Sequence, residues 1–306
     1  MKRIVSVSLG SSKRNASSTA EILGEEVVVE RIGTDGSIDK AIAMIRELDG
    51  KVDAFGMGGI DLYVYGGNSR YTFRTAKKIA AAAQKTPMVD GSGLKNTLER
   101  RVVRYIDQHL MPLKGKKVLM PSALDRFGMA DAITEAGCET MFGDIMFGLG
   151  LNIPIRKRST INTIASILMP IITQLPFTWV YPTGEKQDER QPKFGEAYQW
   201  ADIIAGDALY ILRHMPDRLD GKVILTNTVT KQNVEELRAR GVSMLVTTTP
   251  NLGGRSFGTN VMEGLIVAAA GKQVADLSPA DYEAWLDKIG FVPRVERFDV
   301  MGSTAD

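Results

Sequence analysis

The chain has 306 residues, 44% of them hydrophobic, with one Cys, two His and a formal net charge of +2 from 38 Lys+Arg and 36 Asp+Glu. This composition excludes a disulfide framework and a Cys/His zinc cluster, and the balanced charge gives no basic field for nucleic acid. No apolar run reaches the roughly 18 residues that a membrane helix needs, and the first residues lack the apolar core of a signal peptide, so we expect a cytoplasmic protein with no membrane partner.

Short apolar runs alternate with amphipathic stretches along the whole chain. Most runs are continuous, which is typical of strands covered on both faces. The predicted strands are Ile4–Leu9, Val27–Ile32, Ala54–Met57, Met88–Val89, Lys117–Met120, Glu139–Phe142, Thr178–Tyr181, Ile203–Ala205, Val223–Thr226 and Met244–Thr248. The predicted helices are Ser37–Leu48, Tyr71–Gln84, Leu94–Leu110, Met129–Ala136, Ile161–Leu175, Ala208–Met215, Val234–Arg240 and Val261–Ala270. This order predicts parallel sheets joined by right-handed crossovers.

The pattern indicates two domains. It breaks near Pro112 and restarts from Gly115 as six strand–helix units, the content of one doubly wound domain. We therefore predict an α/β protein with an N-terminal substrate-type α/β domain at 1–112 and a Rossmann-like doubly wound parallel sheet at 113–275. Ser278 and Pro279 predict a helix start, and we expect the helix and tail at 276–306 to pack back on the first domain.

Glycine is concentrated in four loops that follow predicted strands. Ligands bind at the carboxyl ends of parallel strands, where glycine allows close approach and Ser, Thr, Lys and Arg supply donors. The candidate ligand-binding residues are Ser11, Ser12, Lys13, Arg14, Asp61, Gly254, Arg255, Ser256, Thr259 and Asn260. These loops indicate an anionic or polyhydroxylated small molecule as the partner. The alternative is that turns after strands need glycine, and helix caps need Ser or Asn, without any ligand.

The second predicted domain opens with a strand, a turn and a helix, where a Rossmann domain carries its glycine-rich turn. Ser122 and Arg126 stand in place of the first two glycines, and only Gly128 remains. Asp144 follows the next strand at the offset of the acidic residue that binds the ribose of NAD, although it could instead cap the loop after that strand. With Asn227 at the end of a later strand, these residues are the candidate NAD-binding set.

The chain resembles bacterial proteins described as quinate or shikimate 5-dehydrogenase-like. The two-domain layout and the segments Val5–Ser12, Val89–Glu99 and Gly254–Asn260 carry the resemblance. It implies NAD(P)-dependent oxidation of a ring hydroxyl, with a Lys–Asp pair on the substrate domain. The sequence contains neither an N-V-T-x-P-x-K segment nor an intact G-x-G-G turn.

Chemistry on a hydroxyl group requires a positioned acid or base. Lys95 and Asp90 share one glycine-rich loop and are the candidate catalytic residues, although Lys95 could simply be a solvated residue in the first turn of a helix. His109 and His214 lie at predicted helix ends, where the helix dipole favours a charged imidazole, and Cys138 is expected to fill core space.

Three functions remain open from the sequence. The first is an NAD-dependent oxidoreductase that acts on a small quinate- or shikimate-like hydroxylated acid in an interdomain cleft. The second is a non-catalytic ligand-binding or sensory protein for an anionic metabolite, which the degenerate turn favours. The third is a lyase or transferase that binds phosphate at Gly254–Asn260. We expect no metal site, and a homodimer on the frequency of such assemblies.

Overall fold

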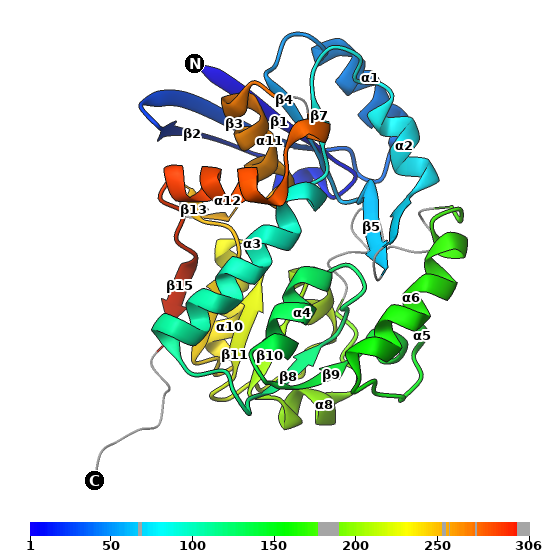
Figure 1. Cartoon of the computed structure of the whole chain (residues 1–306), viewed down its shortest axis with the longest axis vertical. Helices are drawn as coiled ribbons and strands as arrows, with labels where there is room; N and C mark the ends of the chain where they lie inside the picture. Colours follow the sequence, from blue (N-terminus) through cyan, green and yellow to red (C-terminus); the bar gives the residue numbers. More distant parts are fainter. Residues whose placement is uncertain (67–68, 177–189, 253–254, 257, 273, 299–306) are drawn as a thin grey trace. The chain divides into compact units, whose positions relative to one another are not determined.

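The computed structural model describes residues 1–66, 69–176, 190–252, 255–256, 258–272 and 274–298 of a mixed α/β protein (Figure 1). The chain forms two compact units. Unit 1 comprises Met1–Thr97, Ala165–Asp188 and Gly258–Phe291, and unit 2 comprises Leu98–Ile164, Glu189–Phe257 and Val292–Asp306. The predicted α/β fold class is confirmed.

The division into units differs from the predicted boundaries in several places. Ala165–Asp188 belongs to unit 1, although it was predicted within the Rossmann-like domain, and Val292–Asp306 belongs to unit 2, although the tail was expected to pack back on the first domain. Helix α3 (Ser92–Tyr105) belongs to unit 1 up to Thr97 and to unit 2 from Leu98, ahead of the predicted break at residue 112. Helix α11 (Thr259–Ala270) belongs to unit 1, although its residues were predicted to end the Rossmann-like domain. Sequence patterns show only the order of elements along the chain. Helix α11 belongs to unit 1 because it packs against strands of that unit.

The sheet of unit 1 has five strands in the order β2-β3-β1-β4-β7. Their bounds are β1 Lys2–Ser8, β2 Ala16–Ile22, β3 Glu25–Gly33, β4 Ala54–Gly58 and β7 Met88–Val89. β1 pairs in parallel with both β3 and β4, and β4 with β7, whereas β2 is antiparallel to β3. The carboxyl ends of β1, β4 and β7 therefore lie at one edge of the sheet, where ligands bind in open α/β sheets.

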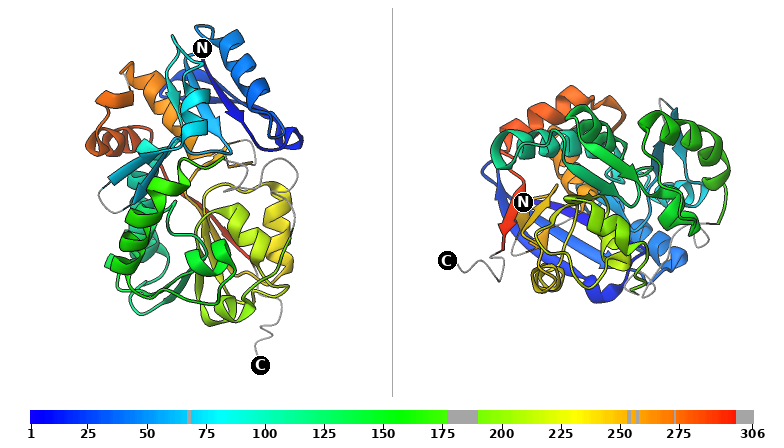
Figure 2. Two further views of the ribbon diagram at one scale, coloured as in Figure 1. Left: turned by 90° about the vertical axis from the view of Figure 1, so that its right-hand side faces the viewer. Right: turned by 90° about the horizontal axis from the view of Figure 1, so that it is seen from below.

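Helices cover the sheet of unit 1 on both faces (Figure 2). Helix α1 (Ile38–Leu48) packs against β1 and begins at Ser37, whose side chain accepts a hydrogen bond from the Lys40 N–H. Helix α11 packs against β1, β4 and β7, and its first nine residues are buried. Helix α12 (Pro279–Lys288), which starts at a Ser278 capping box as predicted, also belongs to unit 1.

The sheet of unit 2 has six strands in the order β15-β12-β11-β10-β8-β9. Their bounds are β8 Lys117–Met120, β9 Glu139–Phe142, β10 Ile203–Ala205, β11 Val223–Thr226, β12 Met244–Thr247 and β15 Arg294–Arg297. Five strands are parallel, and β15 is antiparallel to β12. The chain leaves β8 toward β9 on one side and returns to β10 on the other, so a topological switch point lies between β8 and β10.

Shorter elements complete both units. The remaining α-helices are α2 Arg74–Ala80, α4 Phe127–Glu135, α5 Asp144–Leu149, α6 Arg158–Ile172, α8 Gly195–Trp200, α9 Ala208–His214 and α10 Lys231–Ala239. Two hairpins, β5 Tyr63–Gly66 with β6 Ser69–Thr72 and β13 Asn251–Leu252 with β14 Arg255–Ser256, and the turns η1 Ser12–Arg14, η2 Ile106–Leu110 and η4 Val274–Asp276 occupy the loops. The strand predicted at Thr178–Tyr181 lies outside the described residues. None of the helices among the described residues is long and apolar enough to span a membrane.

Candidate functional site

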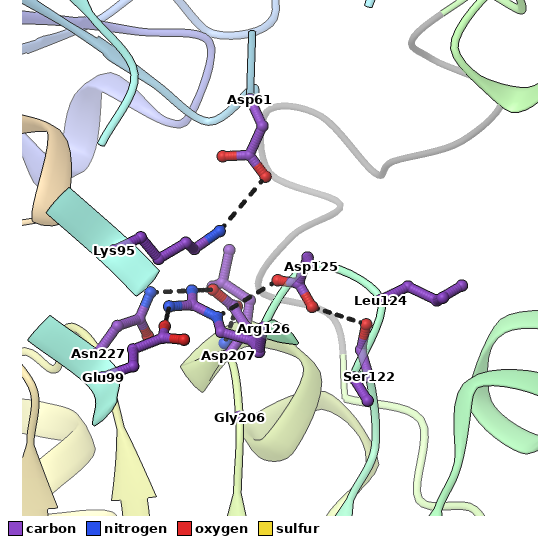
Figure 3. Close-up of polar contacts among 12 residues, drawn as sticks. Asp61, Lys95, Glu99, Ser122, Leu124, Asp125, Arg126, Gly206, Asp207 and Asn227 are labelled. Atoms are coloured by element: carbon purple, nitrogen blue, oxygen red, sulfur yellow. Dashed lines mark hydrogen bonds and ion pairs between the residues drawn. The ribbon is translucent and has the colours of Figure 1, made fainter. Parts of the chain in front are cut away.

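In unit 1, Asp61 and Lys95 form an ion pair with 3.7 Å between Asp61 Oδ2 and Lys95 Nζ (Figure 3). Asp61 lies in the loop after β4, and Lys95 lies in the first turn of α3, which follows β7. Their side chains are 28% and 16% exposed, so each is partly shielded from solvent. The sequence named both residues, and the fold brings them together.

Asp90 holds the loop that carries Asp61. Its Oδ2 accepts hydrogen bonds from the N–H groups of Leu62 at 2.7 Å and Tyr63 at 2.9 Å, and its Oδ1 accepts one from the Ser92 N–H at 3.0 Å. A carboxylate that binds three backbone donors is rigidly placed. Asp90, the predicted catalytic carboxylate, thus binds backbone N–H groups of its own loops, and Asp61 is the carboxylate beside Lys95.

The chain's own atoms fill much of the space that glycine leaves in the loops of unit 1. A Cβ at Gly91, which has a φ of +93°, would lie 2.7 Å from the Asn260 backbone nitrogen. A Cβ at Gly56 would lie 2.8 Å from the Asn260 side chain, which donates to Ser6 Oγ at 2.8 Å. These two glycines let α11 approach the sheet, which fits the alternative that the loops need glycine without any ligand.

The other predicted binding residues of unit 1 are engaged in local structure. Ser11 is buried and its Oγ accepts a hydrogen bond from the Lys13 N–H, which starts the turn η1 that also contains Ser12 and Arg14. Thr259 is buried with Asn260 at the start of α11. Gly254 lies outside the described residues, and the side chains of Arg255 and Ser256 in β14 are likewise not described.

In unit 2, Arg126 lies in the loop between β8 and α4, beside the switch point, and is only 3% exposed. Its guanidinium group donates to Glu99 Oε1 at 2.6 Å and to Asp207 Oδ2 at 2.8 Å, and its Nε lies 3.4 Å from Asp125 Oδ2 (Figure 3). Burial lowers the pKa of Arg126, but the three carboxylates more than offset this and keep its pKa above the ordinary value. Arg126 is therefore a buried counter-ion of three carboxylates.

Two more predicted cofactor residues belong to this network. Ser122 donates to Asp125 Oδ1 at 2.8 Å. Asn227 donates from Nδ2 to Asp207 Oδ2 at 2.9 Å and accepts the Ala208 N–H at 3.1 Å. The fold thus brings Ser122, Arg126 and Asn227 into one network, but their side chains donate to the carboxylates of Asp125, Glu99 and Asp207.

Asp144 turns toward the same loop. Its Oδ1 accepts the N–H groups of Ala123 and Leu124, both at 2.9 Å, and its Oδ2 is buried without a hydrogen-bond partner among the described residues. Burial raises the pKa of Asp144 to about 7, although the two N–H donors lower it. Asp144 thus holds the β8–α4 loop through Oδ1, and α5 has no side-chain cap, so the expected cap of the loop 143–150 is not formed by this residue.

These residues do not fit a dinucleotide in the usual position. The N–H groups of a Rossmann turn bind the pyrophosphate, but here Asp144 takes two of them. The predicted packing glycine, Gly128, is buried in the first turn of α4. A pyrophosphate at this turn would also meet three carboxylates that share one guanidinium group.

Neither His214 nor Cys138 is activated by its surroundings. His214 ends α9 as predicted, but burial lowers its pKa, so the imidazole is neutral rather than charged. Burial raises the pKa of the half-buried Cys138 to about 11, so its thiol is not activated. Within the described part of the chain, no cluster of His, Cys, Asp or Glu is arranged to hold a metal ion.

Two protein families match parts of this chain. Residues 93–298, more than half of the chain, match the family described as a domain of unknown function, DUF8754. The chain belongs to the DUF8754 family. Its residues 3–90 match a second domain of unknown function, DUF8753. Among curated proteins, no sequence matches this chain significantly.

Three of the solved structures that match this DUF8754 protein show the extent of the similarity. A glutamate dehydrogenase from Thermus thermophilus has a TM-score of 0.44 at 10% identity, over 94% of this chain and 73% of that chain. A galactofuranose-binding protein has a TM-score of 0.35 at 11% identity, over 95% and 99%. An NAD-dependent malic enzyme from Thermotoga maritima has a TM-score of 0.32 at 11% identity, over 94% and 84%. Similarities of this size carry no argument about function.

Sequence reasoning missed Glu99, Asp207 and Glu263. Glu99 and Asp207 lie 27 and 81 residues from Arg126, so only the fold brings them to it. Glu263 lies within the apolar run Val261–Ala270, where a single carboxylate among hydrophobic residues is a usable signal.

Proposed function

We propose that this protein binds a small hydroxylated carboxylic acid at Asp61 and Lys95 of unit 1, and that it does so without a dinucleotide. The ion pair between these two side chains, on a loop held by Asp90, is the observation that carries the proposal. An ammonium group offers three donors and a carboxylate offers only acceptors. A hydroxyl group next to a carboxylate matches both, because the hydroxyl donates to Asp61 while the acid accepts from Lys95.

The resemblance of the sequence to quinate or shikimate 5-dehydrogenase-like proteins supports a polyhydroxylated ring acid as the ligand class. The buried counter-ion network of unit 2 supports the absence of a nucleotide, because Arg126 and Asp144 already satisfy the groups that would bind one. This is the ligand-binding alternative that the degenerate turn favours.

The second candidate is the NAD-dependent oxidoreductase. One observation favours it: the strand order β9-β8-β10-β11-β12 is the flavodoxin-like doubly wound order 2-1-3-4-5, in which a nucleotide cofactor binds at the switch point, here between β8 and β10. This function needs a hydride acceptor on unit 2, and the β8–α4 loop supplies no contacts for one in the usual position.

Calorimetric titration with quinate and with shikimate tests the proposal. We expect the wild type to bind one of these acids, and Lys95→Ala and Asp61→Asn each to weaken binding at least about tenfold, the effect of one lost charged hydrogen bond. Lys78→Ala, on the exposed face of α2, is the matched control and should bind as the wild type does. Wild-type affinity in Lys95→Ala, or no binding of either acid at millimolar concentration, contradicts the proposal.

A thermal-shift measurement with NAD and NADP separates the two candidates. Under the proposal neither nucleotide raises the unfolding temperature at millimolar concentration, because a ligand stabilises only a protein that binds it. A clear shift with either nucleotide would move the support to the oxidoreductase.

A further inference from the structure

Glu263 is an ionisable residue in the apolar helix α11 and is 1% exposed. A carboxyl group in such a place costs free energy unless hydrogen bonds or protonation compensate for the lost water. The groups that surround Glu263 therefore decide whether its carboxyl group is charged or neutral.

Three elements of unit 1 face this carboxyl group. Tyr282 of α12 donates its hydroxyl hydrogen to Glu263 Oε1 at 2.7 Å. Gly93, at the start of α3, lies so close to Oε1 that a Cβ there would collide with it. From the loop between β7 and α3, the Asp90 carboxylate acts on it as a like charge. The second oxygen, Oε2, is buried and has no hydrogen-bond partner among the described residues.

The charge of Glu263 depends on pH near neutrality. Burial raises its pKa to about 8, and the charge of Asp90 raises it further, whereas the Tyr282 hydroxyl and the N–H groups of Gly91 and Gly93 lower it. At pH 7 the carboxyl group is therefore mostly protonated and neutral. Above pH 8 it becomes a second negative charge near Asp90, at a buried position where solvent screens it little.

Asp90 links this buried group to the ion pair. It binds the N–H groups of Leu62 and Tyr63, which directly follow Asp61, and that of Ser92 at the start of α3, the helix of Lys95. Whatever displaces the Asp90 carboxylate moves both members of the pair.

We infer that Glu263 is a positioning residue, which in its neutral form keeps the Asp90 loop in place and so holds Asp61 beside Lys95 for the ligand. This inference rests on the proposed function. A residue of α11 then controls how Asp61 and Lys95 are placed, although the position of α11 in the sequence does not suggest this. The site is competent while Glu263 carries its proton and is distorted when the proton leaves.

The affinity for quinate or shikimate, measured by calorimetry from pH 7 to pH 9, tests this inference. Deprotonation of one group costs up to about tenfold in affinity per pH unit above its pKa, so wild-type affinity should fall by up to about tenfold across this range. Glu263→Gln is neutral at every pH and keeps an acceptor for Tyr282, so its affinity should match the wild type at pH 7 and stay constant to pH 9. Glu47→Gln, on the exposed face of α1, is the control and should follow the wild-type profile.

A second variant does not depend on tolerance of Glu263→Gln. Tyr282→Phe removes a hydrogen bond that lowers the pKa of Glu263, so the fall in affinity should move to higher pH. A residue with only a structural role would lower affinity without moving the pH profile.

The outcomes separate the two claims. Binding by the wild type at pH 7 with the same pH profile in Glu263→Gln overturns the inference and leaves the proposed function standing. An unmoved profile in Tyr282→Phe also overturns it. No binding by the wild type at pH 7 overturns both.

Discussion

Replacement of Arg126 by Met tests whether this guanidinium group is an internal counter-ion. The side chain is 4% exposed, and its partners Glu99, Asp125 and Asp207 are 1%, 9% and 20% exposed. Removal of one partner from a buried ion pair typically costs about 3–5 kcal/mol, because the remaining charge stays buried without compensation. Three carboxylates share Arg126, so we expect the loss to lie in the upper part of that range.

Urea unfolding, followed by circular dichroism and Trp fluorescence, measures this loss in the transition of unit 2. Arg218→Met is the matched control, because Arg218 pairs with Asp220 in the same unit but both side chains are exposed, and it should unfold as the wild type does. The gap between Arg126→Met and the wild type should narrow from pH 8 to pH 5, since proton binding neutralises the carboxylates that have lost their cation. An unfolding free energy within about 1 kcal/mol of the wild type at pH 8 would refute the reasoning.

Three further predictions follow from the same contacts. The raised pKa of Asp144 makes the folded protein lose stability as pH rises toward 7, and Asp144→Asn removes this loss. Between pH 5 and pH 8 the free energy of unfolding of the variant in urea should therefore rise by about 2–3 kcal/mol relative to that of the wild type. Parallel pH profiles of the two proteins would contradict this. Gly91→Ala should cost at least about 2 kcal/mol more than Gly24→Ala, because both have positive φ but only the Cβ at Gly91 meets another backbone, that of Asn260; equal losses in unfolding free energy would exclude the collision. Asp90→Asn should weaken binding of the acid about tenfold while the unfolding of unit 2 stays unchanged, and undiminished affinity would show that Asp90 positions nothing.

The central strands of both sheets could be predicted because burial on two faces leaves a direct mark in the sequence. The runs Ile203–Ala205 and Val223–Thr226 are continuous, buried and bounded as predicted. The edge strands could not be predicted in this way. β2 (ASSTAEI) alternates between exposed and half-buried residues, and β15 (RVER) has no fully buried residue, so each owes its strand conformation to the backbone of its neighbour.

The helix predicted at Tyr71–Gln84 was wrong at its start, because Tyr71 and Thr72 pair with β5 and the helix begins only at Arg74. Apolar residues spaced for a helix do not reveal that the first residues of the segment form a hairpin strand instead.

The site was predictable at the level of loops and not at the level of contacts. Asp61 and Lys95 were both named, but their distance along the chain hides their pairing until β4 and β7 are placed side by side. Arg126 was singled out as a departure from a glycine-rich turn, and its position suggested phosphate binding. Its partners come from α3 and from the end of β10, so only the structure shows that its charge is already matched.

The most direct test of the account is the electron density of crystals soaked with quinate or shikimate in the absence of nucleotide. Binding of the acid to unit 1 alone predicts an ordered acid within hydrogen-bond distance of Lys95 Nζ and the Asp61 carboxylate. Density for the acid only elsewhere on the chain, or density beside Asp61 and Lys95 that forms only when NAD or NADP is also present, would contradict it.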